Sequence, residues 1–186
     1  MTVRSAISRV VPVAPHAVLK FEMIKVIIVM GVAGSGKTTI GQSLAQRLQW
    51  NFADADDYHP PANVTKMSAG QPLTDEDRKP WLSALSSMIQ NWIATGQSTV
   101  LACSALRSSY RNILQTDNNS VALIYLKGDF ELFNKRLSGR SGHFMKATML
   151  TSQFQTLEEP EDVCTVDASK DPAEIVDEIC RRLALK

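Results

Sequence analysis

Short apolar runs alternate with helical patterns along most of the chain. Between the runs, apolar side chains recur at three- and four-residue spacing, which is typical of helices with one buried face. Strict alternation of strands and helices favours a parallel sheet with helices on both sides. The pattern therefore predicts an α/β fold of three layers around a five-stranded parallel sheet. The five runs predicted as strands are 26–30, 50–53, 99–103, 121–126 and 163–166.

The first apolar run leads into a glycine-rich loop and then into a helical pattern. The loop meets the spacing G-x-x-x-x-G-K-[ST] with Gly31, Gly36, Lys37 and Thr38. In such a P-loop the glycines let backbone N–H groups face a phosphate, the lysine reaches the terminal phosphates and the hydroxyl ligates magnesium. A glycine-rich turn with an exposed lysine is the alternative, and the flanking strand and helix patterns disfavour it. The residues expected to bind ATP are Gly31, Val32, Ala33, Gly34, Ser35, Gly36, Lys37, Thr38 and Thr39.

Three acids, Asp54, Asp56 and Asp57, follow the second predicted strand. Strand ends of a parallel sheet face the ligand crevice, so acids there can hold the water shell of a metal or deprotonate an attacking hydroxyl. Asp54 and Asp56 lie two residues apart and can reach opposite sides of the strand end, while Asp57 is suited to cap the turn. A solvated turn with helix-capping acids is the alternative for all three.

Two helices are predicted between the second and third strands. A short helix over 61–69 begins with proline, and a longer one begins with the capping-box pattern 74–77 and stops at Gly96. Trp81 and Trp92 lie on the apolar face of the longer helix, which favours packing over base stacking. Past the third strand lies Arg107, either as a surface residue or as an anion contact.

A basic, glycine-rich stretch follows the fourth predicted strand. Arg136 and Arg140 are expected on one helical face, four residues apart, where like charges repel mildly. A polyphosphate would compensate them, and a solvated basic face is the alternative. We interpret 136–160 as a lid and 57–96 as a substrate-binding segment, the parts that close small kinases around their ligands.

Composition and charge indicate which kind of molecule the protein binds. A chain of 186 residues suits one domain, and a formal net charge of +1 favours neither nucleic acid nor a membrane surface. No apolar stretch reaches the length of a transmembrane helix. The cysteines Cys103, Cys164 and Cys180 are far apart, and we expect small buried side chains in a reducing compartment. A small-molecule partner follows.

The first residues differ in pattern from the remainder. Residues 1–22 carry basic side chains and no acid before Glu22, while Pro12 and Pro15 interrupt any amphipathic helix. We interpret 1–22 as a disordered or non-native extension and 23–186 as a single domain, with an organelle-targeting leader as the alternative for the extension.

Two functional classes fit a P-loop, a small-molecule kinase and a nucleotide-gated switch. A guanine-specific switch normally offers an N-K-x-D motif. Here the only Asn-Lys pair, at 134–135, is followed by Arg136 and Leu137. The sequence therefore favours the kinase.

Eight stretches together resemble one family of small kinases. From Met23 to about Leu183 the chain resembles the gluconokinases of the thermoresistant bacterial type, which are related to shikimate and adenylate kinases. The departures are Ala33, where serine is frequent, and Arg107, where lysine is usual. The matching stretches are 30–38, 54–60, 63–67, 72–82, 103–107, 125–128, 142–144 and 153–160.

The resemblance implies transfer of phosphate from ATP to D-gluconate with magnesium, giving ADP and 6-phospho-D-gluconate. Phosphoryl transfer depends on positioning and electrostatics, a role suited to Lys37, Arg136 and Arg140. Thr38 and Asp54 would hold magnesium directly or through water, and Asp56 would orient the attacking hydroxyl and take its proton. Another small hydroxy acid such as shikimate is the alternative substrate.

The carboxylate of the substrate requires cations of its own. The sequence does not rank its four candidates, which are His59, Lys66, Arg78 and Arg107. His143 lies in the predicted lid, where it either contacts a ligand or only holds the hinge. Family members are commonly homodimers in the cytoplasm, so the resemblance implies the same assembly and location here.

Overall fold

The computed structural model describes residues 24–139 and 143–185, with the side chains of 143–147 left undescribed. Its sheet is five-stranded, with strand order β2-β3-β1-β4-β5 and every neighbouring pair parallel, which confirms the predicted fold. The elements are β1 (Val26–Met30), α2 (Lys37–Leu48), β2 (Asn51–Asp54), a 3-10 turn η1 (Ala55–Tyr58), α3 (Pro61–Ser68), α4 (Asp75–Thr95), β3 (Thr99–Ala102), α5 (Ser108–Leu114), β4 (Val121–Lys127), α6 (Phe130–Ser138), α7 (His143–Thr156), β5 (Cys164–Asp167) and α8 (Pro172–Arg182).

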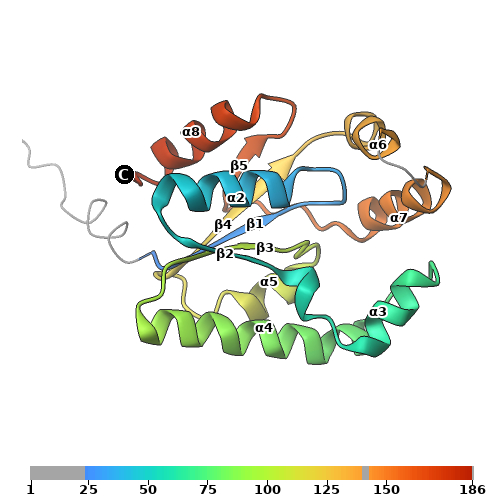
Figure 1. Cartoon of the computed structure of the whole chain (residues 1–186), viewed down its shortest axis with the longest axis horizontal. Helices are drawn as coiled ribbons and strands as arrows, with labels where there is room; N and C mark the ends of the chain where they lie inside the picture. The colour runs from blue at the N-terminus through green and yellow to red at the C-terminus, as the bar shows by residue number, and fades with distance from the viewer. Residues whose placement is uncertain (1–23, 140–142, 186) are drawn as a thin grey trace, which may run out of the picture.

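The sheet separates two layers of helices, as Figure 1 shows. Helices α2 and α8 cover one face, and α4 and α5 cover the other. Strand β1 lies in the middle, and its side chains alternate between the two cores. Ile27 and Val29 pack into one core, while Ile28 and Met30 pack into the other, all of them fully buried. The continuous apolar runs in the sequence therefore reflect burial on both faces.

Local sequence signals set most of the helix ends. The Thr74 hydroxyl and the Asp77 carboxylate form the predicted capping box at the start of α4, and Gly96 ends this helix in the left-handed conformation. Asp129 accepts a hydrogen bond from the Leu132 N–H and caps α6, as predicted. Trp81 and Trp92 are buried on α4, which confirms their packing role.

The segment after β4 differs from its prediction. Helix α6 ends at Ser138, with Gly139 as its C-cap, whereas the prediction continued the helical pattern from Arg136 to Arg140. Glycine weakens helical continuation, which explains the early end. Helix α7 then begins at His143, three residues before the expected start at Lys146. Arg140 itself lies outside the described residues.

The cysteines follow the prediction in part. Cys103 and Cys180 are buried, Cys164 is only partly buried on the edge strand β5, and all three are free thiols. None of the helices in the described ranges is long and apolar enough to cross a membrane.

Candidate active site

The P-loop joins β1 to α2 and has the backbone that its glycines predict. Gly34 and Gly36 adopt φ angles of 79° and 98°, which side chains rarely tolerate. A Cβ atom on Gly34 would also lie 2.8 Å from the Phe133 carbonyl oxygen, so this glycine lets α6 pack directly on the loop. Within the described residues, no side chain caps the start of α2. Its first N–H groups can therefore bind a phosphate.

Lys37 begins α2 and folds back over the loop. Its Nζ donates a hydrogen bond to the Val32 carbonyl oxygen at 3.1 Å. Burial lowers the pKa of the Lys37 ammonium, and the nearby Asp56 and Asp54 carboxylates partly oppose that shift. A desolvated ammonium with few partners interacts strongly with an incoming anion. Lys37 therefore has the position and the electrostatics of a phosphate ligand.

Thr38 and Asp54 meet at the ends of α2 and β2. The Thr38 hydroxyl donates to Asp54 Oδ2 at 2.9 Å, and Asp54 Oδ1 accepts from the Asp56 N–H at 3.2 Å. A hydroxyl and a carboxylate are oxygen ligands that Mg²⁺ accepts, with water and substrate phosphates completing its shell. No cluster of three or more acid, histidine or cysteine side chains occurs in the described ranges, so such an ion would depend on those added ligands.

Asp56 occupies η1, directly after β2. Burial raises the pKa of the Asp56 carboxyl, and the Asp54 carboxylate raises it further, while Lys37 and His59 act in the opposite direction. A raised pKa makes a carboxylate a better proton acceptor. Asp57 is exposed, and Asp54 rather than Asp57 caps the turn, because Asp54 has extended backbone at the end of β2 and its side chain accepts from the Asp56 N–H.

The His59 ring packs against an aromatic side chain of α4. It stacks on Trp81 with 4.4 Å between centroids, and the Trp81 Nε1–H donates to the Ala55 carbonyl oxygen at 2.7 Å. Burial lowers the pKa of His59, which favours a neutral ring near pH 7. Spacing along the chain gave no indication of this stacking. The imidazole can still donate or accept one hydrogen bond with a substrate hydroxyl.

Lys66 pairs with an acid at the start of the neighbouring helix. Its ammonium lies 2.6 Å from Asp77 Oδ1, within the capping box of α4. The Lys66 hydrogen bond and the Thr74 N–H lower the pKa of Asp77 to about 2. Lys66 therefore joins α3 to α4, and its charge is compensated.

Arg78 and Arg107 come together, although 29 positions separate them in the sequence. Their guanidinium carbons lie 5.8 and 5.9 Å from the centre of the Tyr110 ring. Asp75 accepts from Arg107 at 2.5 Å, lies 3.9 Å from Arg78 and accepts from the Tyr110 hydroxyl. Asp75 and Tyr110 are site residues that sequence reasoning missed.

The charges around Arg78 and Arg107 help to rank the candidate cations for the substrate carboxylate. Arg111 and Glu158 lie in the same neighbourhood, as do Lys79 and its partner Glu76, so four cations face three carboxylates and one positive charge is in excess. One excess charge matches a monovalent carboxylate. Of the four candidate cations, Arg78 and Arg107 therefore form the pair that can bind it.

The predicted lid residues divide between described and undescribed parts. Arg136 donates to the Ala168 carbonyl oxygen at 2.7 Å, so it already joins α6 to the loop after β5. The side chains of Arg140 and His143 lie outside the described residues. Gln153, on α7, accepts from the Ala33 N–H at 2.6 Å. The helical period predicted α7, but it gave no sign that Gln153 reaches the P-loop.

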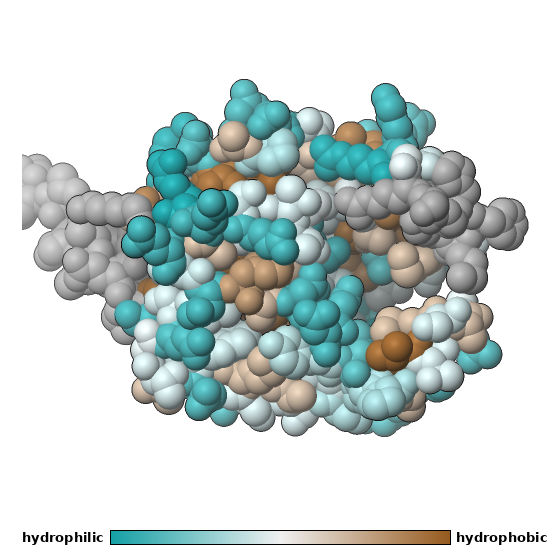
Figure 2. All heavy atoms as spheres, viewed as in Figure 1, coloured by the Kyte–Doolittle hydropathy of each residue, from teal (hydrophilic) through white to brown (hydrophobic). Residues whose placement is uncertain are grey.

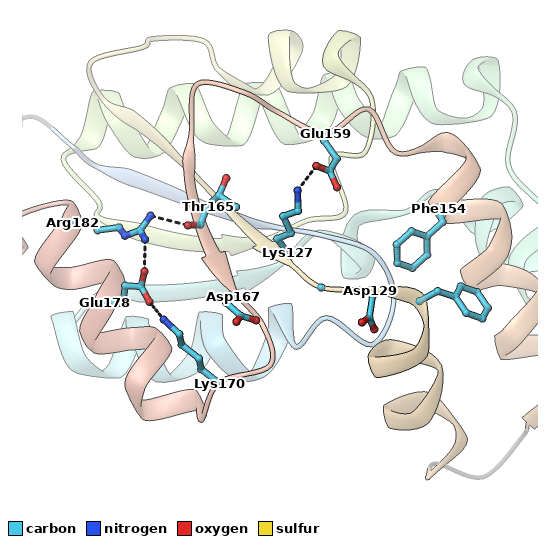
Figure 3. A pocket seen from close by; sticks show the side chains of 11 residues that line it. Lys127, Asp129, Phe154, Glu159, Thr165, Asp167, Lys170, Glu178 and Arg182 are labelled. Atoms are coloured by element: carbon cyan, nitrogen blue, oxygen red, sulfur yellow. Dashed lines mark hydrogen bonds and ion pairs between the residues drawn. The ribbon is translucent and has the colours of Figure 1, made fainter.

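A hollow of about 740 Å³ lies elsewhere, along the edge strand β5 (Figure 3). Its charges compensate one another, because Lys127 pairs with Glu159, and Glu178 pairs with both Lys170 and Arg182. Side chains already paired in this way gain little from an added anion. The residues expected to bind phosphate and carboxylate lie instead at the carboxyl ends of β1, β2 and β3, on the side where the surface in Figure 2 opens beside α3.

Known proteins similar to this chain include several gluconokinases. A probable gluconokinase of Xenopus tropicalis is 45% identical over 172 residues, covering 83% of this chain and 90% of that protein. A gluconokinase of Gluconobacter oxydans is 44% identical over 158 residues, covering 83% and 89%. The crystal structure of a gluconokinase from Sinorhizobium meliloti 1021 superposes with a TM-score of 0.79 at 39% identity, covering 87% of this chain and 93% of that one.

The fold and the P-loop together place this chain among the nucleotide-binding P-loop kinases. The family model described as shikimate kinase matches residues 33–184. Within that broader group, the chain belongs to the gluconokinase family.

Proposed function

We propose that this protein transfers the γ-phosphoryl group of ATP to D-gluconate, giving ADP and 6-phospho-D-gluconate. One observation carries the proposal: the phosphate loop, Asp56 and the Arg78–Arg107 pair share one edge of the sheet. Asp56 interacts electrostatically with Lys37 on one side and with His59 on the other, and His59 interacts with Arg78. The order along this edge matches a substrate with a carboxylate at one end and a reacting hydroxyl at the other.

Both substrates are anions, so their binding depends on the positive groups of the site. Arg78 and Arg107 hold the gluconate carboxylate, and a guanidinium can bind two carboxylate oxygens at once. Lys37 and the P-loop N–H groups hold the phosphates of ATP. Thr38 and Asp54 would hold Mg²⁺, which supplies charge neutralisation on the transferred group when bound.

The chemical step then needs one proton acceptor. Asp56 accepts the proton of the substrate hydroxyl as its oxygen forms a bond to the γ-phosphorus. The bond between that phosphorus and the bridging oxygen breaks, and ADP leaves with the electron pair. Lys37 follows the charge of the transferred group, and we assign the same task to Arg136 and Arg140 of the lid. We keep 57–96 as the substrate-binding segment and 136–160 as the lid.

Assembly and location are carried by the family resemblance alone. We propose a cytoplasmic homodimer, to be tested by light scattering on the purified protein and by fractionation of the cells that make it. The extension 1–22 is proposed to play no part in the chemistry, since all residues assigned above lie after it.

A coupled assay of ADP release tests the proposal across D-gluconate, shikimate, glycerate and nucleoside monophosphates, with product identity from mass spectrometry. We expect rapid turnover on gluconate with a product heavier by one phosphate. A higher kcat/KM on shikimate would contradict the assignment and favour the alternative substrate.

A further inference from the structure

One short segment contacts both the phosphate loop and the loop that carries Arg107. Gln153, near the end of α7, accepts a hydrogen bond from the Ala33 N–H at 2.6 Å. Five residues on, the Glu158 N–H donates to the Leu106 carbonyl oxygen at 2.9 Å, and Glu158 Oε2 accepts from the Ser108 N–H at 2.7 Å. The segment 153–158 therefore connects the phosphate loop to the Arg107 loop, because it bonds to backbone groups of both loops.

The loop after β3 requires such support. Ala105 adopts a φ angle of 43°, a left-handed conformation that is unfavourable for any residue other than glycine. The buried Arg111 guanidinium donates to the Ala105 and Leu106 carbonyl oxygens at 3.1 and 3.0 Å. A strained backbone persists only where surrounding contacts determine it.

Arg107 lies between the two residues that Glu158 holds. Glu158 contacts Leu106 on one side of Arg107 and Ser108 on the other, so the backbone of Arg107 is fixed at both ends. The Ser108 N–H holds the pKa of Glu158 below its usual value, as expected for an ionised acceptor. Movement of this loop would displace the guanidinium relative to the P-loop.

We propose that Gln153 and Glu158 are positioning residues that set the spacing between the nucleotide and the substrate carboxylate. The inference rests on the proposed function, because it assigns Arg107 to gluconate and Ala33 to the phosphate loop. Neither side chain needs to touch a reacting atom.

Glu159 provides a matched control. It is the adjacent acid, but it pairs with Lys127 at 2.6 Å and contacts the Tyr125 hydroxyl at 3.3 Å, away from the Arg107 loop (Figure 3). Glu159→Gln therefore removes a neighbouring charge without changing the support of Arg107.

The test compares Glu158→Ala, Glu158→Gln and Glu159→Gln by steady-state kinetics with ATP and gluconate. A hydrogen bond from a backbone N–H to a charged acceptor is strong enough for an expected rise of about tenfold in the gluconate KM of Glu158→Ala. The ATP KM should stay within about twofold, a change too small to indicate a lost contact. Glu158→Gln keeps an acceptor oxygen and should restore most of the loss, and Glu159→Gln should match wild type.

If Glu158 acted only through its negative charge, the gluconate KM would change in the opposite direction. Removing a carboxylate near Arg107 would strengthen attraction for gluconate, so Glu158→Ala and Glu158→Gln would both lower its KM. That result would overturn the proposal, as would equal changes in both KM values. If the alanine variant fails to fold, Glu158→Gln still excludes the effect of charge, because only that effect lowers its gluconate KM, and Gln153→Ala then tests the positioning role.

Gln153→Ala tests the other end of the segment. Loss of one neutral hydrogen bond should raise the ATP KM roughly fivefold and leave the gluconate KM nearly unchanged. An unchanged ATP KM would contradict the role of Gln153. Wild-type protein inactive on gluconate would contradict the proposed function, whereas an active wild type with an unaffected Glu158→Ala variant would contradict only this inference.

Discussion

At the scale of single residues, the catalytic role proposed for Asp56 should carry a cost in stability. Its pKa is raised by burial first and by Asp54 second, so the folded protein binds this proton more tightly than the unfolded chain does. Stability from this group is fully present below the ordinary aspartate pKa of 3.8 and is lost as the pH rises through the raised value. We therefore expect this charge to lower the stability of wild type at neutral pH, where the proposed base must be ionised.

Asp56→Asn should separate the two effects. Turnover should fall by roughly 100-fold or more, the scale of a lost general base, while the ATP KM changes little. Melting of the ligand-free, metal-free variant at pH 7.5 should occur at a higher temperature than melting of wild type, and the difference should narrow toward pH 5. An equal loss in ATP binding would instead place Asp56 on the metal, and Asp54→Asn should be assayed beside it.

Lys37→Ala tests the phosphate loop. The ammonium follows the charge of the transferred group, so turnover should fall by about 100-fold or more at saturating gluconate. Circular dichroism should show an unchanged fold, because burial of this ammonium opposes its charged form and its removal costs the fold little. A variant that keeps more than about a tenth of wild-type turnover would contradict the assignment of Lys37.

Residue roles could be predicted from sequence where they depend on local spacing. The P-loop glycines, the Thr74 cap and the Asp129 cap are set by neighbours within a few positions, and each was confirmed. The four candidate cations could not be ranked, because their charges depend on contacts made through the fold. Lys66 meets Asp77 eleven residues away, and Arg107 meets Asp75 across 32.

At the scale of elements, the two candidate cations Arg107 and Lys66 differ by what surrounds them. Arg107 lies past β3 with an excess of positive charge around it, whereas Lys66 on α3 is compensated by Asp77. We predict that Arg107→Ala raises the gluconate KM by about 10- to 100-fold, the scale of a lost charge-assisted contact. Arg107→Lys should retain only part of the affinity, since it keeps the charge but loses the two-oxygen contact of the guanidinium.

Lys66→Ala is the matched control for that measurement. Its gluconate KM should stay within about threefold of wild type, while its melting temperature falls slightly through loss of the exposed ion pair. If Lys66→Ala raised the gluconate KM as much as Arg107→Ala, the charge count around Asp75 would not decide which cations bind the substrate.

Helix boundaries also show where sequence patterns stop being informative. The strands and the long helix α4 carry strong periodicity, and their predicted extents agree closely with those in the structure. Around Gly139 the predicted helical pattern runs past Ser138, where α6 ends, so the face predicted for Arg136 and Arg140 extends beyond the described helix. Periodicity reports which residues face a core, but the end of a helix depends on the cap.

At the scale of the whole molecule, parallel strands bring distant segments to one edge. Strand β1 lies between β3 and β4, so the P-loop after β1 is adjacent to the Arg107 loop after β3. Alternation in the sequence predicted the parallel sheet, but strand order depends on which way each connection crosses, a choice made by packing of the two cores. The residues proposed to bind nucleotide and those proposed to bind substrate consequently lie on adjacent loops at the same edge of the sheet.

Ligand-linked stability should reveal those two sets of residues without any turnover. Each ligand that binds only the folded state adds stability of about 2.7 kcal/mol at 100 times its Kd. For a domain of this size that corresponds to a rise of roughly 5 to 10 °C in melting temperature. We therefore expect wild type to melt higher with a non-hydrolysable ATP analogue plus magnesium, and also with gluconate alone.

The variants should lose these shifts selectively. Lys37→Ala should lose most of the nucleotide shift and keep the gluconate shift, because its charge faces the phosphates. Arg107→Ala should show the reverse, because its guanidinium faces the Asp75 side of the crevice. Differential scanning fluorimetry at fixed ligand concentrations measures all four cases. If Arg107→Ala lost the nucleotide shift and kept the gluconate shift, Arg107 would belong to the phosphate site, and the substrate carboxylate would have to be bound by Arg140 of the lid.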